Sequence, residues 1–119
     1  TDYDELNILY DAIISNPYHI AGKDRFDTDF IKAMNGNAVT KVGGEGVRGL
    51  GIRTSKGNAY GIAIKIIDGN QRCNPIATIA ILKELKLISE EQLEVLQIYD
   101  NIKLQNHRGI EVGSIQVEL

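Results

Sequence analysis

The chain has 119 residues, of which 43% are hydrophobic and 24% charged, and its net charge is −3. This length suits one small domain, and this composition is typical of a folded globular protein and argues against disorder, collagen-like repeats and membrane spans. Acidic and basic residues are scattered without a Lys/Arg block, which argues against nucleic acid or an anionic membrane as a partner. We therefore expect a single domain over residues 1–119.

The chain contains one cysteine, Cys73. An internal disulfide is therefore impossible, and no cysteine cluster offers a zinc site, so we expect no metal and no cofactor. A reducing cytoplasm fits this cysteine usage. The sequence begins at Thr1 without an initiator methionine or an export signal, and we interpret it as a segment of a longer protein.

The first third of the chain predicts two helices. Apolar side chains recur with helical spacing from Leu6 to Ile13, which indicates an amphipathic helix over about residues 3–15. Pro17 ends this helix, because the residue before a proline is disfavoured in the helical conformation. After a loop, a second helix is expected over about residues 27–34.

Three charged residues lie at the start of this second helix. Asp27 is its predicted N-cap. Arg25, Asp27 and Asp29 could together bind the carboxylate and ammonium of an amino acid, or they could form a capped helix start with a paired arginine. The second arrangement is the commoner one in proteins, so these residues are left out of the predicted site.

The middle of the chain predicts three neighbouring antiparallel strands. Along the third of them, bulky residues from Tyr60 to Ile66 alternate with small residues from Ala59 to Ala63, so one face of this strand is small. We expect another element to lie close against that small face. The predicted strands cover about residues 38–42, 47–54 and 59–67.

The last third predicts two more helices and a final strand. A wide apolar arc indicates a buried helix over about residues 72–86. Ser89 to Gln92 form a capping-box signature, which begins a helix over about residues 90–97. Imperfect alternation predicts a strand over about residues 112–118 that returns to the sheet. The predicted fold class is α+β, with an antiparallel sheet of three to four strands packed with helices.

The segment Lys41-Val42-Gly43-Gly44-Glu45-Gly46-Val47 carries the strongest functional signal. One interpretation is a loose hairpin with weak edge strands. The other is that side chains are absent so that a ligand can approach backbone amides, while Lys41 supplies a fixed ammonium group. Glu45 could orient Lys41 or touch the ligand, or it could be a turn carboxylate facing solvent. The predicted site residues are Lys41, Gly43, Gly44 and Glu45.

Five segments follow one another along nearly the whole chain: Asn-Pro-Tyr-His-Ile-Ala-Gly at 16–22, Arg-Phe-Asp-Thr-Asp-Phe at 25–30, the Lys-x-Gly segment at 41–47, Lys-Ile-Ile-Asp-Gly-Asn-Gln-Arg at 65–72, and Asn-His-Arg-Gly with Val-Gly-Ser-Ile within 106–115. In this order and spacing they resemble the C-terminal part of the L-asparaginase II family, the thermolabile asparaginases. Each segment alone is short, but five in register cover almost all of the sequence.

The resemblance implies a fold related to serine β-lactamases and glutaminases, in which Lys-x-Gly lies on a strand lining the active site. In those enzymes the serine of a Ser-x-x-Lys element attacks the amide carbon, a lysine of lowered pKa takes its proton, and backbone N–H groups hold the oxyanion. By this resemblance Lys41 steadies the anionic substrate or takes part in proton transfer, and Gly43 and Gly44 give access to backbone amides. The implied substrate of the full-length form is asparagine.

The sequence departs from the family pattern because none of its serines stands in Ser-x-x-Lys, and members of the family are well over twice this length. The cysteines and lysine that form a metal site in some members lie upstream of the matched segments, and Cys73 does not occupy those positions. We therefore expect an inactive fragment of an amidohydrolase that converts L-asparagine to L-aspartate and ammonia. The alternative is a small non-catalytic α+β module that dimerises through its exposed sheet. A homodimer is expected for this chain.

Overall fold

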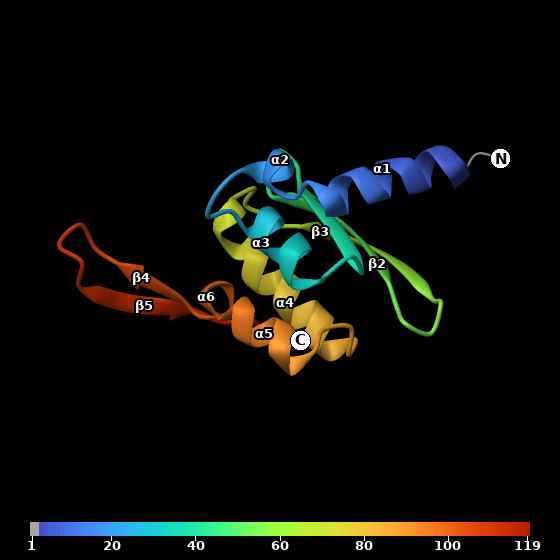
Figure 1. Ribbon diagram of the computed structural model, residues 1–119. Coiled ribbons are helices and arrows are strands. Elements are labelled where there is room, and N and C mark those ends of the chain that lie inside the picture. Colours follow the sequence, from blue (N-terminus) through green and yellow to red (C-terminus); the bar gives the residue numbers. More distant parts are fainter. Residues whose placement is uncertain (1–2) are drawn as a thin grey trace.

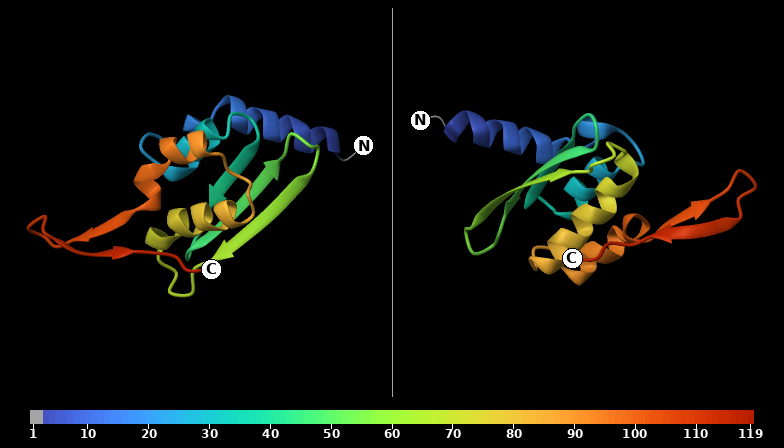
Figure 2. Two further views of the ribbon diagram at one scale, coloured as in Figure 1. Left: turned by 90° about the horizontal axis from the view of Figure 1, so that it is seen from below. Right: turned by 180° about the vertical axis from the view of Figure 1, so that it is seen from behind.

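The structure is a computed structural model and describes residues 3–119. It contains a three-stranded antiparallel sheet packed with helices, and a two-stranded hairpin that projects from this body (Figures 1 and 2). The predicted α+β class and the three neighbouring strands are confirmed. The helices are α1 (Tyr3–Ser15), α2 (Tyr18–Ala21), α3 (Phe26–Ala33), α4 (Asn74–Glu84), α5 (Glu90–Val95) and α6 (Gln97–Asp100), with a 3-10 helix η1 (Gln71–Cys73) before α4. The strands are β1 (Ala38–Val42), β2 (Val47–Arg53), β3 (Ala59–Lys65), β4 (Ile102–Gln105) and β5 (Glu111–Ile115).

The main sheet has the order β1-β2-β3, and its two faces differ in burial. Helices α3 and α4 pack on one face, where they bury Leu50 and Ile52 of β2 and Ile64 of β3. The side chains of Phe30 and Ile79, from these two helices, are fully buried in the same core. Each such side chain contributes roughly 1.5–3 kcal/mol through burial, so this face holds the domain together.

The opposite face of the sheet is built from small residues and is open. Gly49 pairs with Lys41 on one side and with Ala63 on the other, and Gly51 pairs with Gly61. A Cβ atom added at Gly49 or Gly61 would meet nothing within 4 Å. Our expectation that another element lies close against this face is therefore wrong for the part of the chain that the structure describes.

Helix α1 approaches the edge of the sheet and leaves its centre uncovered. The Tyr10 hydroxyl donates to Gly36 O at 3.1 Å, and the Arg53 guanidinium lies 3.9 Å from the centre of the Tyr10 ring. The apolar side chains of Leu6 and Leu9, which predicted the helix correctly, remain exposed. The helical spacing of these apolar residues therefore predicts the helix, but it does not predict which element the helix packs against.

The start of α3 differs from the prediction. Arg25 occupies the N-cap position and its side chain makes no capping hydrogen bond. Asp27, the predicted N-cap, lies inside the first turn and is buried against Arg48 of β2. A carboxylate at a helix start is drawn to a buried cation more strongly than to exposed backbone N–H groups, because an unpaired buried charge is costly.

The C-terminal strand also differs from the prediction. The predicted strand over 112–118 does not return to the main sheet: β5 pairs with β4, which was not predicted. The turn between them holds Asn106, whose Oδ1 accepts hydrogen bonds from the N–H groups of Arg108 and Ile110 at 2.9 and 3.1 Å. Local closure of this hairpin takes the strand away from the sheet, and residues 116–119 then run back along α4 (Figure 2).

The remaining boundaries are close to those expected. The predicted helix over 72–86 begins as η1 and continues as α4, and the predicted helix over 90–97 is α5 followed by the short α6. The capping box is confirmed, since Gln92 N–H donates to Ser89 Oγ at 3.3 Å and Ser89 N–H donates to Gln92 Oε1 at 2.9 Å. The one-turn helix α2 lies where a loop was expected. None of the helices within residues 3–119 has the length and apolar character needed to cross a bilayer.

Candidate functional site

Lys41 lies near the end of β1, on the open side of the sheet. Its neighbour Thr40 is buried on the helix-covered side, and alternation along the strand turns the Lys41 side chain to the opposite face. Its ammonium donates to the carbonyl of Val42 at 2.8 Å. The Lys41 side chain therefore stands exposed beside glycine backbone, without a carboxylate partner among the described residues.

The turn that follows Lys41 is held in a defined conformation. Glu45 and Gly46 both have positive φ, 54° and 71°, and the Gly46 carbonyl accepts from Ile66 N–H at 2.9 Å. The Lys65 ammonium donates to the carbonyl of Glu45. A Cβ atom at Gly46 would lie 2.9 Å from the Cβ of Ile66, so only glycine fits there. The glycine turn is thus packed against the loop after β3 and is not a loose hairpin end.

The amides of Gly43 and Gly44 differ in their availability. Gly43 N–H already donates to Val47 O at 2.8 Å, and Gly43 O accepts from Gln71 Nε2 at 2.7 Å. Gly44 N–H makes no hydrogen bond with any residue that the structure describes, and a Cβ atom there would meet nothing within 4 Å. In this conformation Gly44 is the residue of the pair whose N–H a ligand can reach.

A buried ion pair lies directly beneath this strand end. The Arg48 guanidinium donates through Nη1 to the Asp27 carboxylate, and both side chains are only 3% exposed. The other Asp27 oxygen accepts from the backbone N–H of Val42 at 2.9 Å. Thr40 Oγ1 accepts from the same Nη1 at 2.9 Å and donates to Gly49 O at 3.1 Å. These bonds tie α3 to β1 and β2 at the point where Lys41 leaves the strand.

A cavity of about 460 Å3 opens at this point, between the start of α3, the end of β1 and the start of α4. Its volume lies in the range of small-molecule sites. The cavity brings Lys41 together with Arg25 and Asp27, the charged residues at the start of α3. The residues that line it are Ile20, Ala21, Asp24, Arg25, Phe26, Asp27, Lys41, Val42, Arg48, Gln71, Arg72, Pro75 and Tyr99.

Tyr99 forms one wall of the cavity as a neutral hydrogen-bond donor. Its hydroxyl donates to Asp29 Oδ2 at 2.6 Å, and its ring packs edge-on against Phe26. Burial, and then the hydrogen bond to the Asp29 carboxylate, raise the pKa of Tyr99 well above its usual value. Tyr99 therefore keeps its proton at neutral pH and cannot act there as a general base.

Of the predicted site residues, Lys41 lines the cavity, whereas Gly43, Gly44 and Glu45 lie in the adjoining turn. Arg48, Gln71 and Tyr99 were not predicted. One signal for Arg48 exists in the sequence: it occupies the same face of β2 as Leu50 and Ile52, and a charge at a buried position requires a partner. Gln71 and Tyr99 reach the cavity only through tertiary packing.

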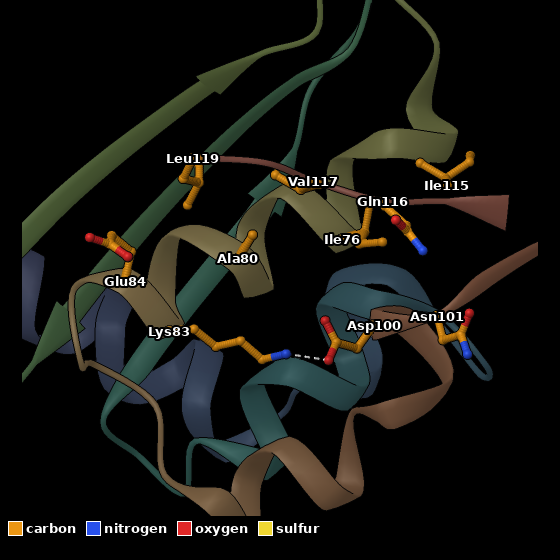
Figure 3. A pocket seen from close by; sticks show the side chains of 10 residues that line it. All are labelled: Ile76, Ala80, Lys83, Glu84, Asp100, Asn101, Ile115, Gln116, Val117 and Leu119. Atoms are coloured by element: carbon orange, nitrogen blue, oxygen red, sulfur yellow. Dashed lines mark hydrogen bonds and ion pairs between the residues drawn. The ribbon is translucent and has the colours of Figure 1, made fainter.

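A larger cavity of about 720 Å3 lies between α4, α6 and the C-terminal residues 115–119 (Figure 3). The ion pair of Lys83 and Asp100 spans it, between α4 and α6. None of the predicted site residues reaches this cavity, whose walls come from α4, the end of α6 and the C-terminal tail. We therefore assign the candidate site to the smaller cavity beside Lys41. Within residues 3–119, no group of three or more His, Cys, Asp or Glu side chains could hold a metal ion.

Comparison with known proteins agrees with the resemblance found in the sequence. A search of curated proteins gave no significant match. The sequence profile of the L-asparaginase II family matches residues 2–117, which is nearly the whole chain. The match includes β1 with Lys41, the glycine turn and every residue that lines the cavity. This chain belongs to the L-asparaginase II family.

Proposed function

We propose that this chain is one part of an amidohydrolase that hydrolyses L-asparagine to L-aspartate and ammonia, and that Lys41 lines its active site. The observation that carries the proposal is the position of Lys41. Its side chain lies exposed on the open face of the sheet near the end of β1, two residues before the glycine turn, and Lys41 is one of the residues that line the smaller cavity. Membership of the L-asparaginase II family supports the same substrate class.

In the proposed mechanism, the serine of a Ser-x-x-Lys element attacks the side-chain amide carbon of asparagine and ammonia leaves, which gives an acyl-enzyme that water then hydrolyses. The chain's four serines are Ser15, Ser55, Ser89 and Ser114, and none begins this pattern. The nucleophile therefore belongs to a part of the enzyme outside this sequence. Lys41 would stabilise negative charge on the substrate, or pass a proton to or from the reacting groups.

The open face of the main sheet supports this division of the site. Gly49 and Gly61 leave that face flat, and a Cβ atom would meet nothing at either position. Glycine on a strand often marks close approach by another backbone. We propose that the layer carrying the nucleophile packs here, beside Lys41, and that the chain without that layer is inactive. We also propose a cytoplasmic location, which suits the single free cysteine, Cys73.

The second candidate function is a non-catalytic module that forms homodimers. Exposed apolar side chains favour it, notably Ile110 and Val112 on the projecting hairpin and Leu6 and Leu9 on α1, because exposed apolar surface promotes association. Light scattering at tens of micromolar tests the dimer, and a monomer mass alone would count against it. A dimer is compatible with both functions, so activity has to discriminate between them.

The discriminating experiment is an asparaginase assay on the 119-residue chain together with the coding sequence upstream of Thr1. We expect no ammonia release above background from the chain alone, and an upstream reading frame that encodes Ser-x-x-Lys. Turnover by the isolated chain would refute the divided site. A stop codon immediately upstream would favour the non-catalytic module.

A further inference from the structure

The peptide that joins Gly43 to Gly44 is held by one side chain. Gly43 N–H donates to Val47 O at 2.8 Å, and Val47 N–H donates to Gly44 O at 3.3 Å, but these bonds belong to the peptides on either side. The carbonyl of the joining peptide, Gly43 O, accepts from Gln71 Nε2 at 2.7 Å. Its N–H, that of Gly44, has no acceptor among residues 3–119. The orientation of this peptide therefore depends on Gln71.

This peptide can rotate more easily than most others in the chain. Glycine stands on both sides of it, so no Cβ atom restricts the backbone angles about which it turns. A Cβ atom at Gly44 would in any case meet nothing within 4 Å. The peptide bond is trans, so its C=O and N–H point in opposite directions. A rotation by half a turn would place the carbonyl oxygen where Gly44 N–H now points, and that oxygen would repel an anion.

The side chain of Gln71 is exposed, yet its position is defined. Its Oε1 accepts from Asn74 Nδ2 at 2.7 Å, and Asn74 is fully buried at the start of α4. The backbone N–H of Asn74 also donates to the carbonyl of Gln71. On the other side, Asn70 Oδ1 caps η1 by accepting from Arg72 N–H at 2.9 Å. Gln71 is thus anchored to α4 through both its backbone and its side chain.

The hydrogen bonds from Asn74 to Gly43 can run in one direction only. The Gly43 carbonyl can only accept, so the amide nitrogen of Gln71 has to face it, and Gln71 Oε1 then requires a donor from Asn74. Asn74 Oδ1 is consequently turned away from Gln71, and it is buried without a partner among the described residues. More than nine in ten buried polar groups have a partner. The amide group of Asn74 is therefore oriented by Gln71 and not by its other neighbours.

We propose that Gln71, anchored by Asn74, is a positioning residue of the active site, which holds the Gly43–Gly44 peptide so that Gly44 N–H is presented to negative charge on the substrate. This inference rests on the proposed function, because that charge forms when a nucleophile attacks the substrate amide. Gln71 lines the smaller cavity together with Lys41, so the side chain that orients the peptide belongs to the same site. Gln71 acts through the peptide, and no step of bond making passes through it.

The first test is NMR of the 119-residue chain. The key variant is Gln71→Met, which is neutral and of similar length but has no N–H donor. We expect Gly44 N–H to become mobile in this variant, seen as an order parameter that falls from about 0.85 to below about 0.6, or as relaxation dispersion. The matched control is Gln97→Met, which changes an exposed glutamine of α6 outside the smaller cavity. It should leave Gly44 N–H as rigid as in the unmodified chain.

The second test is asparagine hydrolysis by the longer protein that carries both Ser-x-x-Lys and this chain. Loss of one oxyanion donor lowers kcat about 100- to 1000-fold, and a donor that is misdirected for part of the time should lower it less. We therefore expect Gln71→Met to reduce kcat at least about tenfold. KM should change less than about threefold, because the N–H acts mainly in the transition state. Gln97→Met should leave both constants unchanged.

Two further measurements separate positioning from loss of the fold. Because Gln71 and Gln97 are both exposed, Gln71→Met and Gln97→Met should give the same circular dichroism spectrum and the same urea midpoint. The inference is overturned if Gly44 N–H is equally rigid in the two variants, or if their kcat values are equal.

Failure of the inference and failure of the proposed function give different results. A mobile Gly44 N–H in Gln71→Met, together with no asparagine hydrolysis by the unmodified longer protein, would contradict the proposed function alone. Hydrolysis that depends on Lys41 but not on Gln71 would contradict the positioning role alone.

Discussion

The buried pair of Asp27 and Arg48 provides the most demanding test of the fold around the site. In Asp27→Ala, the guanidinium stays buried at 3% exposure with its counter-ion removed, and Val42 N–H loses its acceptor. Breaking a buried ion pair by deleting one partner costs about 3–5 kcal/mol. Since the free energy of unfolding of a small domain is about 5–15 kcal/mol, this single substitution should remove a large share of it.

Urea unfolding followed by circular dichroism measures this loss. With an m value of roughly 1.5 kcal/mol per molar, a loss of about 4 kcal/mol lowers the midpoint by about 2–3 M. The matched control is Asp24→Ala, three residues earlier and exposed, which should stay within about 1 kcal/mol of the unmodified chain. The double variant Asp27→Leu with Arg48→Met, which removes both charges, should recover most of the lost stability. Equal midpoints for Asp27→Ala and Asp24→Ala would refute the reasoning.

Three further predictions concern the turn, the cavity wall and a helix start. Gly46→Ala should destabilise the chain by more than about 2 kcal/mol in the same urea assay, because its Cβ would lie 2.9 Å from a neighbour at positive φ, whereas Gly44→Ala should change stability by less than about 0.5 kcal/mol. The raised pKa of Tyr99 means that its stabilising contribution is fully present below about pH 10, the usual tyrosine pKa, and is lost as pH rises further. Tyr99→Phe should therefore flatten the loss of stability above pH 10, and an unchanged alkaline profile would contradict this. Ser89→Ala should cost about 1 kcal/mol in thermal unfolding through loss of the capping box, and an unchanged melting temperature would count against the cap.

Local sequence patterns predicted the positions of the helices and strands better than they predicted which elements pack or pair with one another. The stripe from Leu6 to Ile13 and the capping box at Ser89 gave helices where the structure has them, since both depend on residues within one or two turns. The last strand was placed in the wrong sheet because its pairing depends on β4. That strand has four residues, and its weak pattern gave no signal, although Asn106 and Gly109 mark the turn that follows it.

The candidate site shows the same limit. Lys41 and the charged residues at the start of α3 were each recognised in the sequence, but their meeting in one cavity was not. Asp27 satisfies the local pattern of an N-cap, and only the fold reveals that Arg48, 21 residues later, takes it instead. Choosing between those partners requires the burial of both groups, which is a tertiary property. Sequence therefore identified Lys41 and Arg25 separately, whereas packing identified Arg48 and the cavity that all three line.

The central claim is that Lys41 serves an active site completed by a part of the enzyme outside this sequence. The most direct measurement is the rate of asparagine hydrolysis by the longer protein that carries both Ser-x-x-Lys and this chain, compared between Lys41→Ala and the control Lys56→Ala in the exposed turn after β2. We predict that Lys41→Ala lowers kcat/KM at least about 100-fold, as expected for loss of a proton-transfer or charge-stabilising group, and that Lys56→Ala leaves it unchanged. Equal activity in the two variants would contradict the claim.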